Sequence, residues 1–145
     1  MKDNEYRAWY EGSYWQIQEI NFAGEVVTLY SKKEHSTETV SIDKVVFEQF
    51  TGKHDAKKWE YITEQERERW TQSGNMPSEW RGRKIFTGDI VKTRNGENAE
   101  VKYQAPSFGL DYHEQNVIGI SMYNDSFWSE LLVIGNVHEN PELLK

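Results

Sequence analysis

Residues 131–145 read LLVIGNVHENPELLK, and this stretch decides how the whole sequence is interpreted. Its first four residues are apolar and are followed by Gly135-Asn136, a pattern that predicts a buried strand ending in a turn. Pro141 suits the first position of a helix because it has no N–H to leave unpaired, and Asn140 before it is a suitable N-cap. The tail therefore predicts a strand near 131–134 and a terminal helical turn near 141–144.

Upstream of this tail, the sequence is typical of short strands. Apolar and aromatic residues alternate with polar ones, and turn residues recur about every 8–12 positions, the spacing expected of an all-β domain. The strands predicted in the second half of the chain are Ile85–Lys92, Ala99–Tyr103, Phe108–Tyr112, Val117–Met122 and Trp128–Ile134. Their arrangement around a Gly-Asp strand entry and a hairpin is similar to a small SH3-like barrel, an analogy of fold that brings no function with it.

The segment 56–80 has a different pattern. Thr63 and Glu66 have the spacing of a capping box, which predicts one short helix near 63–72. We favour the interpretation that this segment is a surface excursion held by its aromatic residues, and a lid or docking element is the alternative. The aromatic residues concerned are Trp59, Trp70 and Trp80.

Four segments together resemble the YopX family, small proteins of bacteriophages and prophages, mostly in Gram-positive bacteria. They are Tyr6-Arg7-Ala8-Trp9, Gln49-Phe50-Thr51-Gly52, Ile85-Phe86-Thr87-Gly88-Asp89-Ile90-Val91 and the tail 131–145. The sequence departs from the family pattern at Tyr10, where the family often has Asp, and at 56–80, which looks like an insertion. The resemblance implies a phage or prophage origin and brings no established activity with it.

The predicted fold class is mainly β, with short antiparallel strands and a barrel-like, SH3-like C-terminal half. We expect a single domain in 145 residues, made of an N-terminal meander (1–55), the inserted helical excursion (56–80) and the C-terminal half (81–145). The 6 Trp, 8 Tyr and 6 Phe supply large buried areas and argue against disorder.

Composition excludes several kinds of chemistry. The chain has no cysteine, so disulfides and thiolate chemistry are impossible, and its four histidines lack the spacing of a zinc motif. Its N-terminus has no apolar leader, and no apolar run approaches the ~18 residues of a membrane span. We therefore expect a cytoplasmic protein of the host bacterium that binds no membrane, with no cofactor and no metal site.

The charge pattern argues against nucleic acid as the main partner. The formal net charge is -7, whereas phosphate binding favours a basic face. The concentrated basic run is formed by Arg81, Arg83 and Lys84, close to Phe86, and it supports the alternative of an SH3-like nucleic-acid-binding module. A solvated loop entering a strand explains the same residues, and we favour that interpretation.

Three polar residues are the candidates for chemistry. Asp89 follows Gly88 and has the pattern of a turn residue that bonds backbone N–H groups, although a ligand or base is the alternative. Asp111 and His113 share a strand face, which would suit a metal ion, but the sequence offers no third ligand. If Asp89, Asp111 and His113 converged in one pocket, an enzyme would be favoured; we assign no catalytic residue and predict that the protein is not an enzyme.

The function predicted from these observations is that of a non-enzymatic phage or prophage accessory protein that binds another macromolecule or itself. Short aromatic-rich strands leave open sheet edges, and open edges invite partners, so a homo-oligomer is expected. A phage or host protein is the other expected partner, and nucleic acid is the less favoured one. Arg7, between Tyr6 and Trp9, is predicted to form a cation–π contact or an ion pair on the sheet.

Overall fold

The computed structural model describes residues 5–31, 33–104, 107–113 and 125–145. The chain divides into two compact units, Met1–Phe50 and Thr51–Lys145. Both units are built from antiparallel strands, and the longer of the two described α-helices spans only nine residues, so the predicted mainly-β class is confirmed. The division falls at residue 50, whereas the sequence predicted subdivisions at 55 and 80 within one domain.

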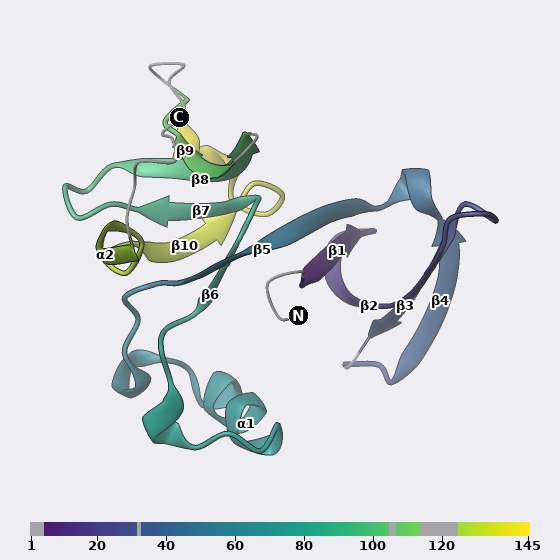
Figure 1. Ribbon diagram of the computed structural model, residues 1–145, viewed down its shortest axis with the longest axis horizontal. Coiled ribbons are helices and arrows are strands. Elements are labelled where there is room, and N and C mark those ends of the chain that lie inside the picture. Colours follow the sequence, from purple (N-terminus) through teal and green to yellow (C-terminus); the bar gives the residue numbers. More distant parts are fainter. Residues whose placement is uncertain (1–4, 32, 105–106, 114–124) are drawn as a thin grey trace. The chain divides into compact units, whose positions relative to one another are not determined.

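The first unit holds five strands of one sheet, in the order β4-β3-β2-β1-β5 (Figure 1), and the sixth strand of this sheet lies next to β5 and belongs to the second unit. Its strands are β1 (Tyr6–Tyr10), β2 (Ser13–Asn21), β3 (Val26–Ser31), β4 (Ser36–Ser41) and the first part of β5 (Val46–His54). Ala8 pairs with Trp15 on one side and with Phe47 on the other, which places β1 between β2 and β5. The core of this unit consists of Ala8, Tyr10, Val27, Leu29 and Val45.

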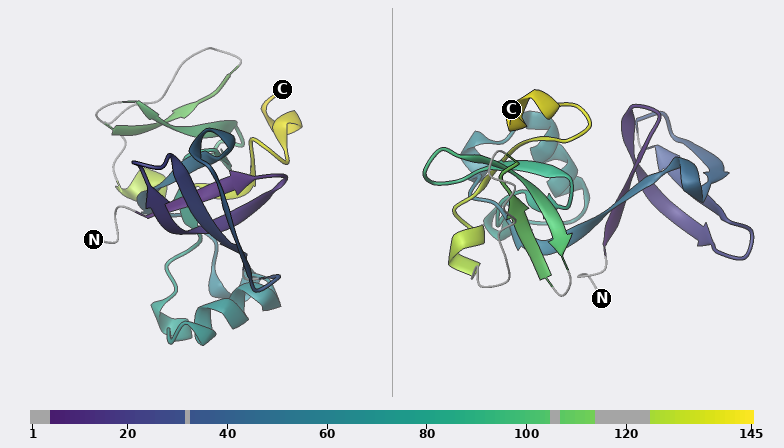
Figure 2. Two further views of the ribbon diagram at one scale, coloured as in Figure 1. Left: turned by 90° about the vertical axis from the view of Figure 1, so that its right-hand side faces the viewer. Right: turned by 90° about the horizontal axis from the view of Figure 1, so that it is seen from above.

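The sheet of the first unit curls around that core (Figure 2). Tyr10 on β1 and Glu38 on β4 lie three strands apart in the sheet order, yet their side chains are hydrogen-bonded. That hydrogen bond, followed by burial and the charges of Glu11 and Glu38, raises the pKa of Tyr10 above its ordinary value, because each favours the neutral phenol. The curvature therefore brings the β4 edge back toward β1.

The second unit holds a four-stranded sheet with the order β10-β7-β8-β9. Its elements are the end of β5, α1 (Glu64–Gln72), β6 (Lys84–Phe86), β7 (Asp89–Lys92), β8 (Asn98–Gln104), β9 (Ser107–Asp111), α2 (Asp125–Trp128) and β10 (Leu132–Asn136). The core contains Ile85, Val91, Ala99, Val101, Leu110, Trp128 and Leu131. The described strands form an open sheet, with β10 and β9 at its edges, rather than a closed barrel.

The strand predicted for Trp128–Ile134 is wrong in its first part. Trp128 ends the short helix α2, and the N–H of Leu131 donates to the Trp128 carbonyl at 3.2 Å. Both side chains reach the core because residues three apart share a side of a helical turn, whereas a strand would place them on opposite faces. The predicted strand Val117–Met122 lies outside the described residues.

The C-terminal tail, residues 131–145, is held by two asparagine side chains. Asn136 Oδ1 accepts the N–H groups of His138 at 3.0 Å and Glu139 at 2.9 Å. Asn140 does not cap the 3₁₀ turn Pro141–Leu144 with its side chain; its Oδ1 instead accepts the Asn136 N–H at 3.2 Å. The helical turn is thus confirmed, and the predicted capping role of Asn140 is wrong because the carboxamide points back toward the strand.

Gly135 makes this arrangement possible. A Cβ at this position would lie 2.5 Å from Asn140 Oδ1, so only glycine leaves room for the carboxamide. The next residues contact the Gly88-Asp89 turn: Asn136 pairs with Asp89, and the Val137 N–H donates to the Gly88 carbonyl at 2.9 Å. Two motifs of the family resemblance therefore meet in the fold, and their shared role is structural.

The segment between β5 and β6 contains the predicted helix. Thr63 Oγ1 accepts the Glu66 N–H at 3.1 Å, and Glu66 Oε1 accepts the Thr63 N–H at 3.0 Å, so the capping box is confirmed. No residue of α1 is fully buried. Edge-to-face contacts among three tryptophans hold the segment instead, with ring centroids 5.2 Å apart for Trp70–Trp80 and 6.0 Å apart for Trp59–Trp80.

Candidate functional site

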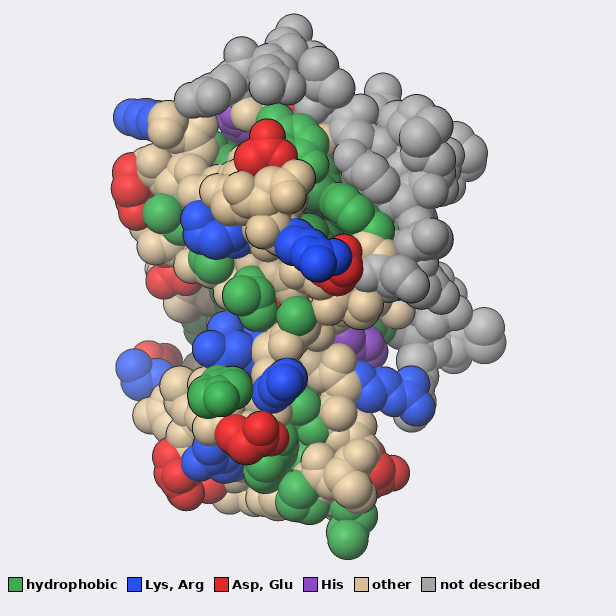
Figure 3. Space-filling view, turned by 90° about the vertical axis from the view of Figure 1, so that its left-hand side faces the viewer, with side chains coloured by type: hydrophobic (Ala, Val, Ile, Leu, Met, Phe, Trp, Pro, Cys, Tyr) green, Lys and Arg blue, Asp and Glu red, His purple; other side chains and the backbone are tan. Residues whose placement is uncertain are grey.

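The predicted basic run does not act as three accessible cations. Arg83 is bound by Glu66 through Nε at 2.8 Å and Nη2 at 2.9 Å, which gives a two-point ion pair. Arg81 and Lys84 are exposed. On the face drawn in Figure 3, Lys and Arg side chains are separated by acidic and apolar ones and form no single basic patch. A role of Arg81, Arg83 and Lys84 in nucleic-acid binding stays a prediction.

The Glu66–Arg83 pair makes stability depend on pH. Burial opposes the charged form of Glu66, but the hydrogen bonds from Arg83 and Thr63, together with the Arg83 charge, hold its pKa below the ordinary value of 4.5. Because the pKa is lower in the folded state, the stabilisation is complete above pH 4.5 and is lost as the pH falls through the folded-state pKa. Glu66 is therefore expected to stabilise the second unit only in its ionised form.

Glu66→Gln tests this expectation, since glutamine can still complete the capping box. We expect wild type to exceed the variant by about 1–2 kcal/mol in unfolding free energy at pH 7. Urea denaturation at intervals from pH 7 to pH 3 should show the difference shrinking below pH 4.5. A difference that does not change with pH would contradict the charge-based account.

A second set of side chains lies on the outer face of the first unit, opposite its core. The Arg7 guanidinium lies 4.0 Å from the centroid of the Tyr14 ring and donates to Glu48 Oε1 at 2.8 Å. The Tyr14 hydroxyl donates to the same oxygen at 2.9 Å, and the Trp9 ring packs edge-on against Tyr14 at 4.8 Å. The predicted cation–π and ion-pair roles of Arg7 are confirmed. Sequence reasoning missed Glu48, which only the β1–β5 register places opposite Arg7.

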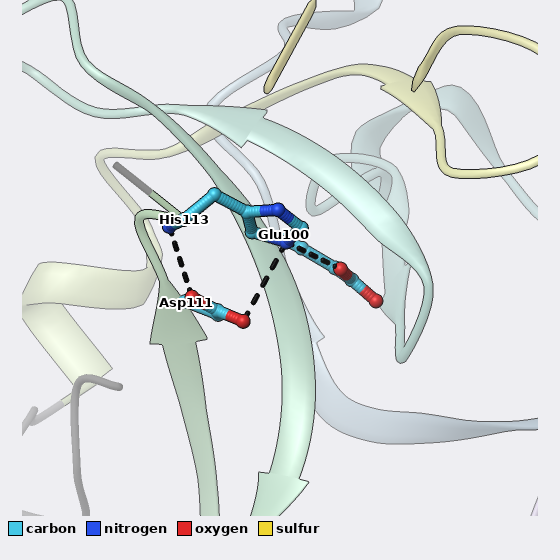
Figure 4. A group of neighbouring side chains, drawn as sticks. All are labelled: Glu100, Asp111 and His113. Atoms are coloured by element: carbon cyan, nitrogen blue, oxygen red, sulfur yellow. Dashed lines mark hydrogen bonds and ion pairs between the residues drawn. The ribbon is translucent and has the colours of Figure 1, made fainter. Parts of the chain in front are cut away.

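A third set is formed where β8 and β9 pair. Glu100 on β8 is directly opposite Asp111 on β9, while the neighbouring pair Val101–Leu110 faces the core. His113 follows Asp111 in a left-handed backbone conformation with φ of 53°, and its N–H donates to Asp111 Oδ1 at 2.9 Å. This local turn directs the imidazole back over the two carboxylates (Figure 4).

The three side chains converge on a small volume. His113 Nε2 lies 2.8 Å from Glu100 Oε1 and 3.5 Å from Asp111 Oδ2. One ligand atom from each residue lies within 4.8 Å of both others. The carboxylates are largely covered, with side-chain exposures of 16 % for Glu100 and 11 % for Asp111, while the imidazole is 37 % exposed. The cluster is therefore anchored at the sheet and open to solvent at the histidine.

Lys102 completes the charge balance of this cluster. Its Nζ lies 2.6 Å from Asp111 Oδ2 and 3.9 Å from Glu100 Oε1. The hydrogen bond to Asp111 and the two carboxylate charges outweigh burial and raise the pKa of Lys102. Burial alone would raise the pKa of Asp111, but the hydrogen bonds from Lys102 and His113, with their charges, bring it below its ordinary value. Both groups are thus charged at neutral pH.

Two of the three residues considered as a possible active site lie close together in the structure. Asp111 and His113 lie together, but the predicted shared strand face is wrong: β9 ends at Asp111, and the turn after it brings His113 back. The third member of the group is Glu100, which sequence reasoning missed. Glu100 and Lys102 alternate with apolar residues in the sequence, which places both on the polar face of their strand, but alternation does not give the cross-strand register. Asp89 is not part of the group: its Oδ2 accepts the Phe86 N–H at 2.8 Å, so the predicted turn role is confirmed.

This all-β protein carries one set of interacting charged side chains in each unit, and in the first unit aromatic rings join the set. Residues 79–145 match the model of the YopX protein family, so this part of the chain confirms the resemblance found in the sequence. No curated protein matches the chain. Within the described residues, no helix is long and apolar enough to cross a membrane.

Proposed function

We propose that the protein is a non-enzymatic accessory protein of a phage or prophage, acting in the host cytoplasm by binding another macromolecule or a second copy of itself. The match of residues 79–145 to the YopX family supports the phage context, through what the resemblance implies. The observation that carries the binding role is the outer face of the first unit, formed by Arg7, Trp9, Tyr14 and Val46 around Glu48.

The composition of this face suits a binding surface. Trp, Tyr and Arg are the residues that contribute most to binding energy at protein interfaces. Val46 is the first residue of β5, pairs with Trp9 in the sheet and is 47 % exposed, so it adds accessible apolar area to this face. Among the described residues of the first unit, the sheet and one short 3₁₀ turn are the only elements.

Val46→Lys is the variant that tests the role of this face, because it adds a charge at an exposed position without opening the core. Phe22→Lys is the matched control, since Phe22 lies in the β2–β3 turn and is 78 % exposed. Tagged wild type and both variants are used for affinity capture from infected host cells, with and without nuclease. Light scattering of the purified proteins over a wide concentration range measures self-association.

We expect wild type to capture a stoichiometric protein partner in the presence of nuclease, or to self-associate in light scattering. The amount captured or self-associated should fall at least tenfold more in Val46→Lys than in Phe22→Lys. Recovery that depends on nuclease-sensitive material would instead favour the nucleic-acid-binding alternative through Arg81 and Lys84. A monomer that captures nothing, or equal recovery by wild type and Val46→Lys, would overturn the proposed role of this face.

A further inference from the structure

We propose that Glu100, Asp111 and His113 form a binding site for one divalent transition-metal ion of the zinc class. The proposal concerns the second unit and is independent of the surface proposed above for the first. It rests on the convergence of an imidazole nitrogen and two carboxylate oxygens from two paired strands.

The spacing of the ligand atoms fits such an ion. With Zn–N and Zn–O bonds of about 2.0–2.1 Å, neighbouring ligand atoms of a tetrahedral site lie about 3.4 Å apart. The observed distances from His113 Nε2, 2.8 Å to Glu100 Oε1 and 3.5 Å to Asp111 Oδ2, lie on either side of this value. Small rotations of the side chains would bring these atoms to the spacing of an ion's ligands, and the cluster is open to solvent on the side of His113.

The donor set also selects among metals. Ca²⁺ and Mg²⁺ prefer all-oxygen sites, whereas an imidazole nitrogen with carboxylates suits zinc and its neighbours in the first transition row. Asp111 supports the arrangement beyond its ligand atom, because its other oxygen, Oδ1, accepts the His113 backbone N–H at 2.9 Å. Contacts of this kind orient the groups that bind a metal.

Lys102 gives the site a property that a simple acidic surface lacks. Its ammonium group contacts Asp111 Oδ2, the same oxygen that would bind the ion, at 2.6 Å. A metal ion must displace this internal cation, and the side chain is 39 % exposed, so it can move into solvent. Lys102 therefore competes with the metal, and its removal should strengthen binding.

Calorimetric titration of the chelator-treated full chain with Zn²⁺ tests the proposal. We expect saturable binding of one ion, weakened at least about tenfold in His113→Gln and in Glu100→Gln. Lys102→Met should bind Zn²⁺ several-fold more tightly than wild type. His35→Gln and Glu64→Gln are matched controls in exposed positions outside the group and should leave the affinity unchanged. Circular dichroism establishes that each variant is folded.

Titration with Mg²⁺ and Ca²⁺ should give no comparable binding. Several outcomes would overturn the proposal: no saturable Zn²⁺ binding by the wild-type chain, equal affinities for wild type and His113→Gln, or weaker binding by Lys102→Met. The last result would show that Lys102 supports the cluster instead of competing for it, and the four side chains would then be a closed network of ion pairs.

Discussion

Gly82→Ala is expected to lower the unfolding free energy of the second unit by about 3 kcal/mol or more. Gly82 has a φ of +112°, a conformation that residues with a Cβ rarely adopt. A Cβ at this position would overlap the Asp55 carbonyl oxygen and lie 2.9 Å from the carbonyl carbon. Relieving this overlap would require the backbone to move. The hydrogen bond from the Asp55 N–H to the Arg83 carbonyl, at 2.9 Å, opposes such a movement.

Gly74→Ala separates the two causes of this loss. Gly74 also has a positive φ, +87°, but nothing lies within 4 Å of a Cβ built there. It should therefore show only the conformational cost, about 1 kcal/mol. Urea denaturation followed by circular dichroism measures both variants. Equal losses would show that the contact with the Asp55 backbone is relieved at little cost, contrary to the expectation.

Asp55→Ala is expected to destabilise the second unit by about 3–4 kcal/mol. The carboxylate is buried and accepts three backbone N–H groups, from Lys57 at 2.9 Å, Arg83 at 2.8 Å and Val133 at 2.9 Å. These donors belong to the segment after β5, to the residue before β6 and to β10. Alanine would leave all three without an acceptor, and unsatisfied buried groups cost more than the net value of the bonds themselves.

Two further variants define the origin of this effect. Asp55→Asn keeps one oxygen acceptor, so its unfolding free energy should fall less than that of Asp55→Ala. It should still fall below wild type, because the amide NH₂ would face one of the three donors. Asp43→Ala, at an exposed aspartate, should change the unfolding free energy by no more than about 0.5 kcal/mol. Hydrogen exchange at the Arg83 and Val133 amides should accelerate in Asp55→Ala. Unchanged exchange there would contradict the three-donor account.

The parts of the fold that were predicted correctly depend on residues close together in the sequence. The capping box of Thr63 and Glu66, the turn role of Asp89 and the terminal turn at 141–144 all involve contacts over three or four positions. Short-range chemistry of this kind is specified locally. The mainly-β class follows similarly from alternation along each strand.

The errors have a common origin in tertiary context. The apolar neighbours of Trp128 are compatible with either a strand or a helical turn. Packing with Leu131 in the core favours the helical turn. Asn140 has the identity of an N-cap, but the space left by Gly135 directs its side chain toward Asn136 instead. In both cases local preference was weaker than the contacts available in the fold.

The mainly-β class, the short helix, the family resemblance and the nearness of Asp111 to His113, two positions apart in the chain, all follow from the sequence. Only the tertiary structure decided that Glu100 joins them, that Glu66 neutralises Arg83, and that Asp55 connects three segments. The physical reason is the same for all three. Each depends on which strand or segment lies beside which, and in what register, and a one-residue shift in register would turn every side chain to the opposite face.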